Sequence, residues 1–264
     1  MKETELCNRL ARTGEDRLLL RRMLDQAVAA ERNNQLCRTH FLSPRETALA
    51  RQLISALGEP AHRFSGGYPD AERQLCLFLP DWMDPETVTE EDLGIGALRV
   101  RWYEGDTLSH RDMLGALMGI GIRRETVGDL LVGADSCDCL VLAELCPFLL
   151  QNLTQAGRSK LRVAQISLDE LIVPVAARKL IRATVSSLRL DAVAACGFST
   201  SRAKLAEAIS SGRVALNDLE CTKPDHPVAE GDRIACRGLG KCCLSAVGGR
   251  SRKGRIALTL ERYI

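Results

Sequence analysis

The spacing between apolar residues changes twice along this chain, and each change predicts a different kind of structure. Residues 1–74 show mainly the three- and four-residue spacing of helices. Residues 75–181 alternate short apolar runs with helical segments, and residues 182–264 combine two short helical segments with alternating strands. The pattern predicts an α+β protein made of three regions.

The first region is predicted to contain two amphipathic helices. In the first helix the apolar residues recur on one face, at Leu19, Met23, Ala27 and Ala30. The second is expected to begin after Ser43, because this serine and Glu46 form a capping box and Pro44 suits the first helical position. It is expected to end at Gly58.

The middle region is predicted to be a small sandwich of one sheet and two helices. Its strands are expected at residues 75–80, 97–104, 130–133, 139–144 and 161–168. Its helices are expected at 111–118, capped by Ser109, and at 147–157. Strands that alternate with two helices favour a sheet with one covered face.

The last region is predicted to be two short helices followed by a small antiparallel sheet. The inner faces of the two helices are formed by Leu190, Val193 and Ala194, and by Leu205 and Ile209. Strands are expected at residues 213–217 and 233–237, and residues 182–191 are expected to act as a link.

Composition is that of a globular protein, with 264 residues of which 45% are hydrophobic and 27% charged. No apolar run approaches the roughly 18 residues of a membrane span, and the charged N-terminal stretch has no apolar signal segment. Eleven cysteines at irregular spacings fit a reducing compartment better than a disulfide framework. We therefore expect a cytoplasmic protein with no membrane partner.

Charge is distributed unevenly along the chain. Residues 186–264 contain 13 Lys and Arg against 8 Asp and Glu, whereas residues 1–185 contain 23 against 26. A basic C-terminal region on a slightly acidic body indicates a polyanionic partner that is contacted mainly by the C-terminal region.

Three cations gather around the second helix of the last region, namely Arg202, Lys204 and Arg213. Ser199 or Thr200 is expected to cap this helix, whose positive end attracts anions. Asn217 offers a donor and an acceptor at a strand end. An ordinary solvated helix face remains the alternative on spacing alone.

The order of residues is more specific than these charges. The stretch from Leu188 to Gly238 resembles the S4 RNA-binding domain through Arg189-Leu190-Asp191, Ser201-Arg202, Ile209, Gly212-Arg213-Val214, Asn217 and Gly231-Asp232. The resemblance implies that the two helices dock on structured RNA. It implies RNA contacts for Arg189, Ser201, Arg202, Lys204, Arg213 and Lys223.

A glycine-rich basic segment follows, from Arg237 to Arg255. Its cations are candidates for phosphate contacts: Arg237, Lys241, Arg250, Arg252, Lys253 and Arg255. A solvated hairpin loop is the alternative. It is not a Walker A loop, because no Ser or Thr follows Lys241.

The segment from Ser109 to Val132 contains His110-Arg111-Asp112, but the asparagine of a kinase catalytic loop is replaced by Leu117. A kinase is therefore rejected. Three arginines near this helix remain as a possible second contact with RNA or the ribosome: Arg111, Arg123 and Arg124.

The segment from Ser109 to Val132, together with "GGYPDAERQ" at residues 66–74, resembles the YlmH family of bacterial S4-domain proteins. This family is also called the RqcP family. The resemblance implies a helical N-terminal region (1–74), an RRM-like central domain (75–181) and an S4 domain with a basic C-terminal hairpin (182–264). It implies a non-catalytic factor that binds ribosomal RNA of the large subunit and peptidyl-tRNA. That factor would support ribosome-associated quality control with the NEMF-type tailing factor RqcH.

No catalytic constellation, cofactor or metal site is expected, because the cysteines lack the paired spacing of zinc ligands and the four histidines lack partner patterns. DNA is not expected as a partner. Two alternatives share the S4 resemblance: an RNA-modifying enzyme of the pseudouridine synthase type, and a ribosome-assembly or heat-shock RNA chaperone. A missing modification in RNA from cells that lack the protein would identify the enzyme.

Overall fold

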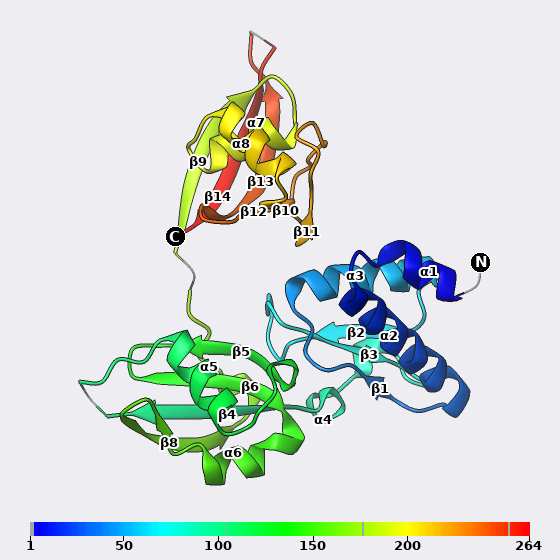
Figure 1. Cartoon of the computed structure of the whole chain (residues 1–264), viewed down its shortest axis with the longest axis vertical. Coiled ribbons are helices and arrows are strands. Elements are labelled where there is room, and N and C mark those ends of the chain that lie inside the picture. Colours follow the sequence, from blue (N-terminus) through cyan, green and yellow to red (C-terminus); the bar gives the residue numbers. More distant parts are fainter. Residues whose placement is uncertain (1–2, 104, 176, 253) are drawn as a thin grey trace. The chain divides into compact units, whose positions relative to one another are not determined.

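The computed structural model describes residues 3–103, 105–175, 177–252 and 254–264. The chain forms two compact units, residues 1–174 (unit 1) and residues 175–264 (unit 2), which are described separately (Figure 1). The α+β class predicted from the sequence is confirmed, since helices pack on antiparallel sheets in both units.

Unit 1 begins with three helices and a small sheet. The helices are α1 (Glu3–Leu10), α2 (Gly14–Asn33) and α3 (Pro44–Ala56). The strands are β1 (Cys37–Arg38), β2 (His62–Ser65) and β3 (Leu75–Phe78), in the order β1-β3-β2. Ser43 and Glu46 form the predicted capping box at the start of α3. Strand β3, which the sequence pattern groups with the middle region, pairs with β1 and β2 instead.

The rest of unit 1 is a two-layer sandwich. Its strands are β4 (Ile95–Trp102), β5 (Val127–Val132), β6 (Ser136–Leu142), β7 (Gln155–Ala156) and β8 (Ser159–Ile166), in the antiparallel order β5-β6-β4-β8-β7. Its helices are α4 (Glu90–Leu93), α5 (His110–Gly119) and α6 (Cys146–Asn152), with short 3₁₀ turns at Pro85–Thr87, Arg124–Thr126, Ala143–Leu145 and Leu168–Glu170. Helices α5 and α6 bury one face of the sheet, and Ser109 caps α5 as predicted.

The two sheets of unit 1 share a hydrophobic core. Leu75 and Leu77 of β3 are buried together with Leu131 and Leu140 of the larger sheet, and Phe41 lies in the same cluster. This common core explains why residues 1–174 form one unit although the sequence pattern divides them.

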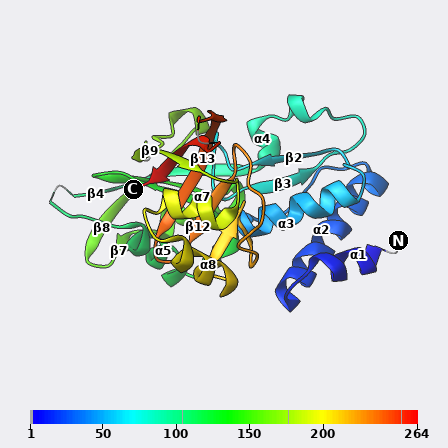
Figure 2. The same ribbon diagram turned by 90° about the horizontal axis from the view of Figure 1, so that it is seen from above.

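Unit 2 is a six-stranded antiparallel sheet with two helices on one face (Figure 1 and Figure 2). Its strands are β9 (Arg178–Val185), β10 (Val214–Leu216), β11 (Leu219–Glu220), β12 (Arg233–Cys236), β13 (Gly240–Arg250) and β14 (Ile256–Tyr263), in the order β11-β10-β12-β13-β14-β9. The helices are α7 (Leu190–Gly197) and α8 (Arg202–Ser210).

Two segments of unit 2 differ from the sequence expectation. Residues 182–185, expected in a link, lie within β9, which pairs with β14 over its whole length. Most of the glycine-rich segment is the long strand β13 rather than a loop. Strand β9 depends on a partner distant in the sequence, β14, and local composition does not reveal such a pairing. Strand β13 instead pairs with its neighbours along the chain, β12 and β14.

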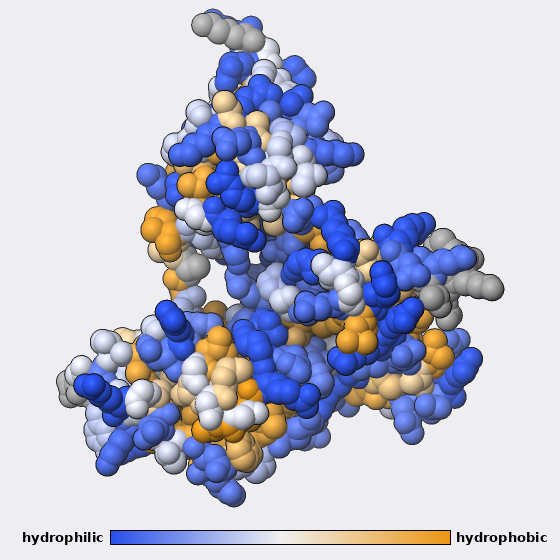
Figure 3. Space-filling view, viewed as in Figure 1, coloured by the Kyte–Doolittle hydropathy of each residue, from blue (hydrophilic) through white to orange (hydrophobic). Residues whose placement is uncertain are grey.

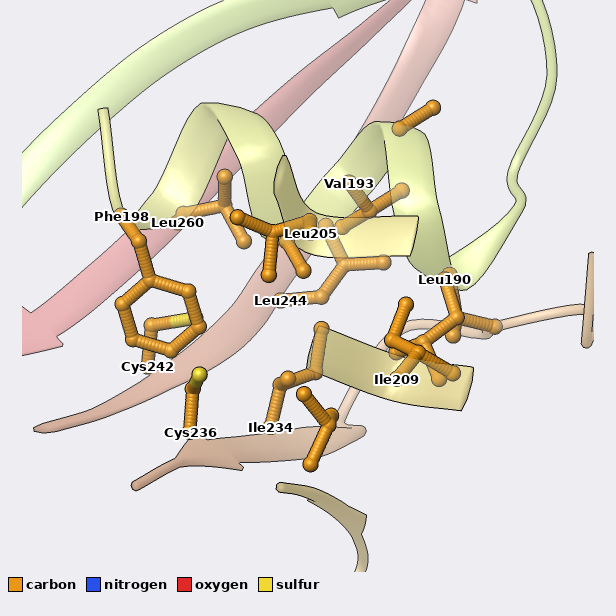
Figure 4. Close-up of a cluster of buried hydrophobic side chains, with 14 of the residues drawn as sticks. Leu190, Val193, Phe198, Leu205, Ile209, Ile234, Cys236, Cys242, Leu244 and Leu260 are labelled. Carbon is orange, nitrogen blue, oxygen red and sulfur yellow. The ribbon is translucent and has the colours of Figure 1, made fainter. Parts of the chain in front are cut away.

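The core of unit 2 lies between the helices and the sheet (Figure 4). Leu190 and Val193 of α7 meet Leu205 and Ile209 of α8, and all four side chains are fully buried. The burial of Leu205 and Ile209 turns the opposite side of α8, which carries Arg202 and Lys204, toward solvent.

Candidate RNA interface

Helix α8 is capped by Ser201, not by Ser199 or Thr200 as the sequence suggested. The Ser201 hydroxyl accepts a hydrogen bond from the Lys204 amide at 3.3 Å. Ser199 lies in the left-handed region with φ 52°, and the Thr200 amide donates to the carbonyl of Ala195. The cap directs Arg202 and Lys204 outward, and Figure 3 shows that this visible face of unit 2 is mostly hydrophilic.

A single carboxylate joins the two helices of unit 2. Asp191, in the first turn of α7, accepts hydrogen bonds from Arg189 at 3.3 Å and from Arg202 Nε at 3.0 Å. The Asp191 side chain is 5% exposed, whereas those of Arg189 and Arg202 are 39% and 50% exposed. Asp191 therefore fixes two guanidinium groups whose outer halves remain in water.

The charge state of Asp191 follows from these contacts. Burial opposes its ionisation, but the hydrogen bonds from Arg189 and Arg202 outweigh burial and lower the pKa of the carboxyl below its usual value. At neutral pH one negative charge faces two positive ones, so the Arg189–Asp191–Arg202 cluster (the S4 cluster) carries a net positive charge.

Lys223 lies next to the S4 cluster because the loop after β11 docks on the start of α7. The Asp191 amide donates to the carbonyl of Pro224, and the Leu190 amide donates to that of His226, both at 2.9 Å. Lys223 directly precedes Pro224 and is exposed. The structure thus brings together cations from three separate parts of the sequence.

A second group of cationic side chains lies near the start of β10. The Arg213 guanidinium donates to the Ser211 hydroxyl at 3.1 Å and lies 3.9 Å from Glu207. The Arg237 amide donates to the Arg213 carbonyl at 2.9 Å, which places these two exposed arginines on adjacent strands.

Asn217 is engaged within its own turn. Its Nδ2 donates to Asp232 at 2.8 Å, and its Oδ1 accepts from the Arg233 amide at 2.9 Å. The residue has φ 50°, a conformation that asparagine tolerates. Both groups of the amide therefore hold the β10–β11 turn against β12.

The remaining C-terminal cations lie along the β13–β14 hairpin, which extends beyond the helices in Figure 1. Lys241 lies near the start of β13, while Arg250 and Arg252 are exposed at its far end. Arg255 Nε donates to the Thr184 hydroxyl at 2.9 Å and ties the hairpin to β9. Lys253 lies outside the described residues.

The three arginines expected near α5 do not form one cluster. Arg111 is exposed at the first turn of α5, where it lines a shallow groove with Gly115 and Gln155. Arg123 follows the other end of α5 and is paired with Glu125 at 3.7 Å.

Arg124 differs from Arg111 and Arg123 because its guanidinium binds backbone carbonyls of unit 1. Its guanidinium donates to the carbonyls of Val127 at 2.7 Å and Gly128 at 3.2 Å. Burial lowers the pKa of Arg124, although the group stays charged at neutral pH. Its donors stabilise the entry to β5.

The loop at residues 66–74, whose residues had no predicted roles, is held by contacts with distant parts of unit 1. Asp129 of β5 accepts hydrogen bonds from the Tyr68 hydroxyl at 2.8 Å and the Glu72 amide at 2.7 Å. Arg73 donates to the carbonyls of Val127 and Phe41. These long-range contacts order the loop, and its turn-rich composition was the only local signal.

Neither a metal site nor a membrane-spanning helix is found in the described part of the chain. No group of three or more metal-ligating side chains occurs among the described residues. No described helix is both long enough and apolar enough to span a bilayer.

Three family models match successive parts of the chain. The model described as "YlmH, N-terminal" matches residues 15–80, and that described as "Putative RNA-binding domain in YlmH" matches residues 89–170. The S4 domain model matches residues 188–234. The last match contains the S4 cluster, Lys223 and Arg213.

Two known proteins extend these matches. The chain is 35% identical over 247 residues to the Ribosome-associated protein quality control protein P2 of Bacillus subtilis (strain 168), covering 92% of this chain and 95% of that protein. The solved structure of the cell division protein ylmH from Streptococcus pneumoniae aligns with a TM-score of 0.53 at 20% identity. It covers 61% of this chain and 97% of that one. The second likeness concerns the fold alone.

Proposed function

Because this chain belongs to the YlmH family of S4-domain RNA-binding proteins, we propose that it is a non-catalytic factor of the large ribosomal subunit. In this proposal it contacts ribosomal RNA and peptidyl-tRNA in the cytoplasm. It supports the C-terminal tailing of stalled nascent chains together with an RqcH-type factor. The similarity to the Bacillus subtilis quality control protein P2 supports the quality-control role.

The observation that carries this proposal is the S4 cluster. Guanidinium groups bind phosphate with two parallel hydrogen bonds, and this geometry is most effective when the group is already oriented. Asp191 orients Arg189 and Arg202 while leaving 39% and 50% of their side chains exposed. Most protein–nucleic acid contacts are made to the backbone, so such a surface suits structured RNA.

The surrounding cations extend the surface along the edge of unit 2. Lys223 lies beside the S4 cluster, and Arg213 and Arg237 form a second pair at β10 and β12. Because each neutralised phosphate releases counterions, binding through this surface should weaken steeply as salt increases.

Arg202→Ala tests the proposal in the full chain. Losing one charge-assisted contact should weaken co-sedimentation with large ribosomal subunits by about tenfold. Arg182→Ala is a matched control, because Arg182 is an exposed arginine of unit 2 on β9, between Ile181 and Ala183, which pack against the core. Full co-sedimentation of a folded Arg202→Ala variant would show that the docking surface lies elsewhere.

A further inference from the structure

One end of the five-stranded sheet in unit 1 has an exposed face. Helices α5 and α6 bury the opposite face. The core shared with β3 covers Ile95 and Leu140 at the other end of the sheet. The segment after β8 crosses the middle, where the Ile172 amide donates to Asp138 at 2.8 Å. The open part is formed by the end of β4 and the start of β8, which lie side by side in Figure 1.

Two neighbouring rows of side chains cross this face, and they differ in charge. In the first row Arg99 of β4 lies between Asp138 of β6 and Ala164 of β8. Arg99 donates to both oxygens of Asp138 at 2.7 and 2.8 Å. The first row is therefore balanced within the protein.

The second row is not balanced. Arg101 of β4 lies directly between Ser136 of β6 and Arg162 of β8. Like charges directly opposite each other on adjacent strands destabilise a sheet. Both arginines are exposed, and neither has a carboxylate partner among the described residues. The nearby Asp135 accepts a hydrogen bond from the Ser136 hydroxyl at 3.2 Å.

Further side chains surround this row. Lys160, two residues before Arg162 on β8, lies on the same face of the sheet and is exposed. Tyr103, directly after β4, is 55% exposed, and the Arg162 guanidinium carbon lies 5.4 Å from the centre of its ring. The open end thus combines three cations with an aromatic platform.

We propose that this surface, formed by Arg101, Tyr103, Lys160 and Arg162 (the sheet patch), binds a single-stranded RNA segment. The three cations receive phosphates, which removes the repulsion between Arg101 and Arg162. A base stacks on an open side of the Tyr103–Arg162 pair, since bases stack on both aromatic rings and guanidinium groups. The inference rests on the proposed function in one respect, namely that RNA is the ligand of this chain.

Single-stranded RNA fits the sheet patch better than an acidic protein segment does. An acidic peptide would satisfy the cations but would offer no flat group to stack on the open side of the Tyr103 ring. A base has a flat face for that ring and a phosphate attached to it through the sugar, so one ligand satisfies both features.

The test uses the full chain and a labelled single-stranded oligouridine. The triple variant Arg101→Ala, Lys160→Ala, Arg162→Ala should bind at least tenfold more weakly, and the salt slope of binding should fall by about 2. Tyr103→Leu should weaken binding about fivefold without changing that slope. With 4-thiouridine in the probe, photo-crosslinks should map to the peptide that contains Tyr103.

A matched control removes the same charge elsewhere in unit 1. Arg17, Arg21 and Arg22 are exposed on α2, and their triple alanine variant should bind as the unaltered chain does. The sheet-patch variant should keep or raise its thermal midpoint, because it removes a like-charged pair, so unfolding cannot account for weaker binding.

Two results would overturn the inference: unchanged oligouridine affinity in the sheet-patch variant, or crosslinks confined to unit 2. A sheet-patch variant that loses binding to acidic peptides but not to RNA would assign the surface to a protein partner instead. Failure of the proposed ribosomal function would appear separately, as full co-sedimentation of Arg202→Ala.

Discussion

Unit 1 contains two nearly buried aspartates hydrogen-bonded to arginine, Asp16 and Asp138, and unit 2 contains one, Asp191. The difference between Asp138 and Asp191 separates a structural ion pair from a ligand-facing one. In unit 1, Asp138 binds one arginine, Arg99, whose side chain is 14% exposed and whose Nη2 also donates to the Glu170 carbonyl. In unit 2, Asp191 shares two arginines that are 39% and 50% exposed. The first pair is satisfied within the fold, whereas the S4 cluster keeps donors for a ligand.

Among the substitutions considered, Asp138→Ala is expected to lower the stability of the protein most. Asp138→Ala leaves Arg99 largely buried without a counterion, which should lower the free energy of unfolding by about 3 kcal/mol. Both tryptophans, Trp82 and Trp102, lie in unit 1, so urea unfolding followed by tryptophan fluorescence reports on this unit alone.

RNA binding by unit 2 provides the control for that variant. Co-sedimentation of the Asp138→Ala protein at a temperature where it stays folded should match that of the unaltered chain. If the free energy of unfolding of unit 1 falls by less than about 1 kcal/mol, water solvates the Arg99 guanidinium in the variant as well as it solvates the arginines of the S4 cluster. That result would contradict the description of Arg99 as a structural partner of Asp138.

A smaller effect is expected from pH. The pKa of Asp191 is lowered in the folded protein, whereas in the unfolded chain it is about 3.9. The stability contribution of this carboxyl is therefore fully present above about pH 4 and is lost as the pH falls through the folded pKa. The thermal midpoint of the full chain, followed by circular dichroism, should be constant between pH 5 and 8 and fall below pH 4.

The variant Asp191→Asn shows how much of the decrease in the thermal midpoint below pH 4 is due to Asp191. This variant should show a weaker decrease below pH 4 than the unaltered chain does. An equal decrease in both proteins would assign the acid sensitivity to other carboxyl groups.

Local signals in the sequence predicted the starts of two helices well, whereas the helix expected at residues 147–157 ends at Asn152 and residues 155–156 form strand β7. Ser43 with Glu46 and Ser109 with Asp112 form capping boxes, because a cap depends only on residues three positions apart. The cap of α8 was misplaced by one or two residues, since Ser199, Thr200 and Ser201 are chemically similar. The fold distinguishes them by the left-handed conformation of Ser199, the Thr200 amide's bond to Ala195, and the bond that Ser201 accepts from the Lys204 amide.

Long-range pairings could not be predicted in this way. Strand β3 and strand β9 find partners across the fold, and their local composition fits several positions. The site shows the same limit. Arg189 and Arg202 were predicted as RNA contacts, but their common dependence on Asp191 appears only when α7 and α8 pack together.

Charge density alone does not show which arginines bind the fold and which face each other. Arg124 was grouped with Arg111 and Arg123, yet its guanidinium binds backbone carbonyls. Arg101 and Arg162 are 61 residues apart in the sequence, and only the register of β4 and β8 shows that they face each other.

In the proposed function, Asp191 orients two arginines for RNA. The affinity of full-length Asp191→Asn for large ribosomal subunits, measured at fixed salt, tests it most directly. The substitution removes a negative charge, so electrostatics alone would tighten RNA binding. Our account predicts weaker binding, by about threefold to tenfold, because the guanidinium groups lose their fixed orientation. Equal or tighter binding by the folded variant would contradict it.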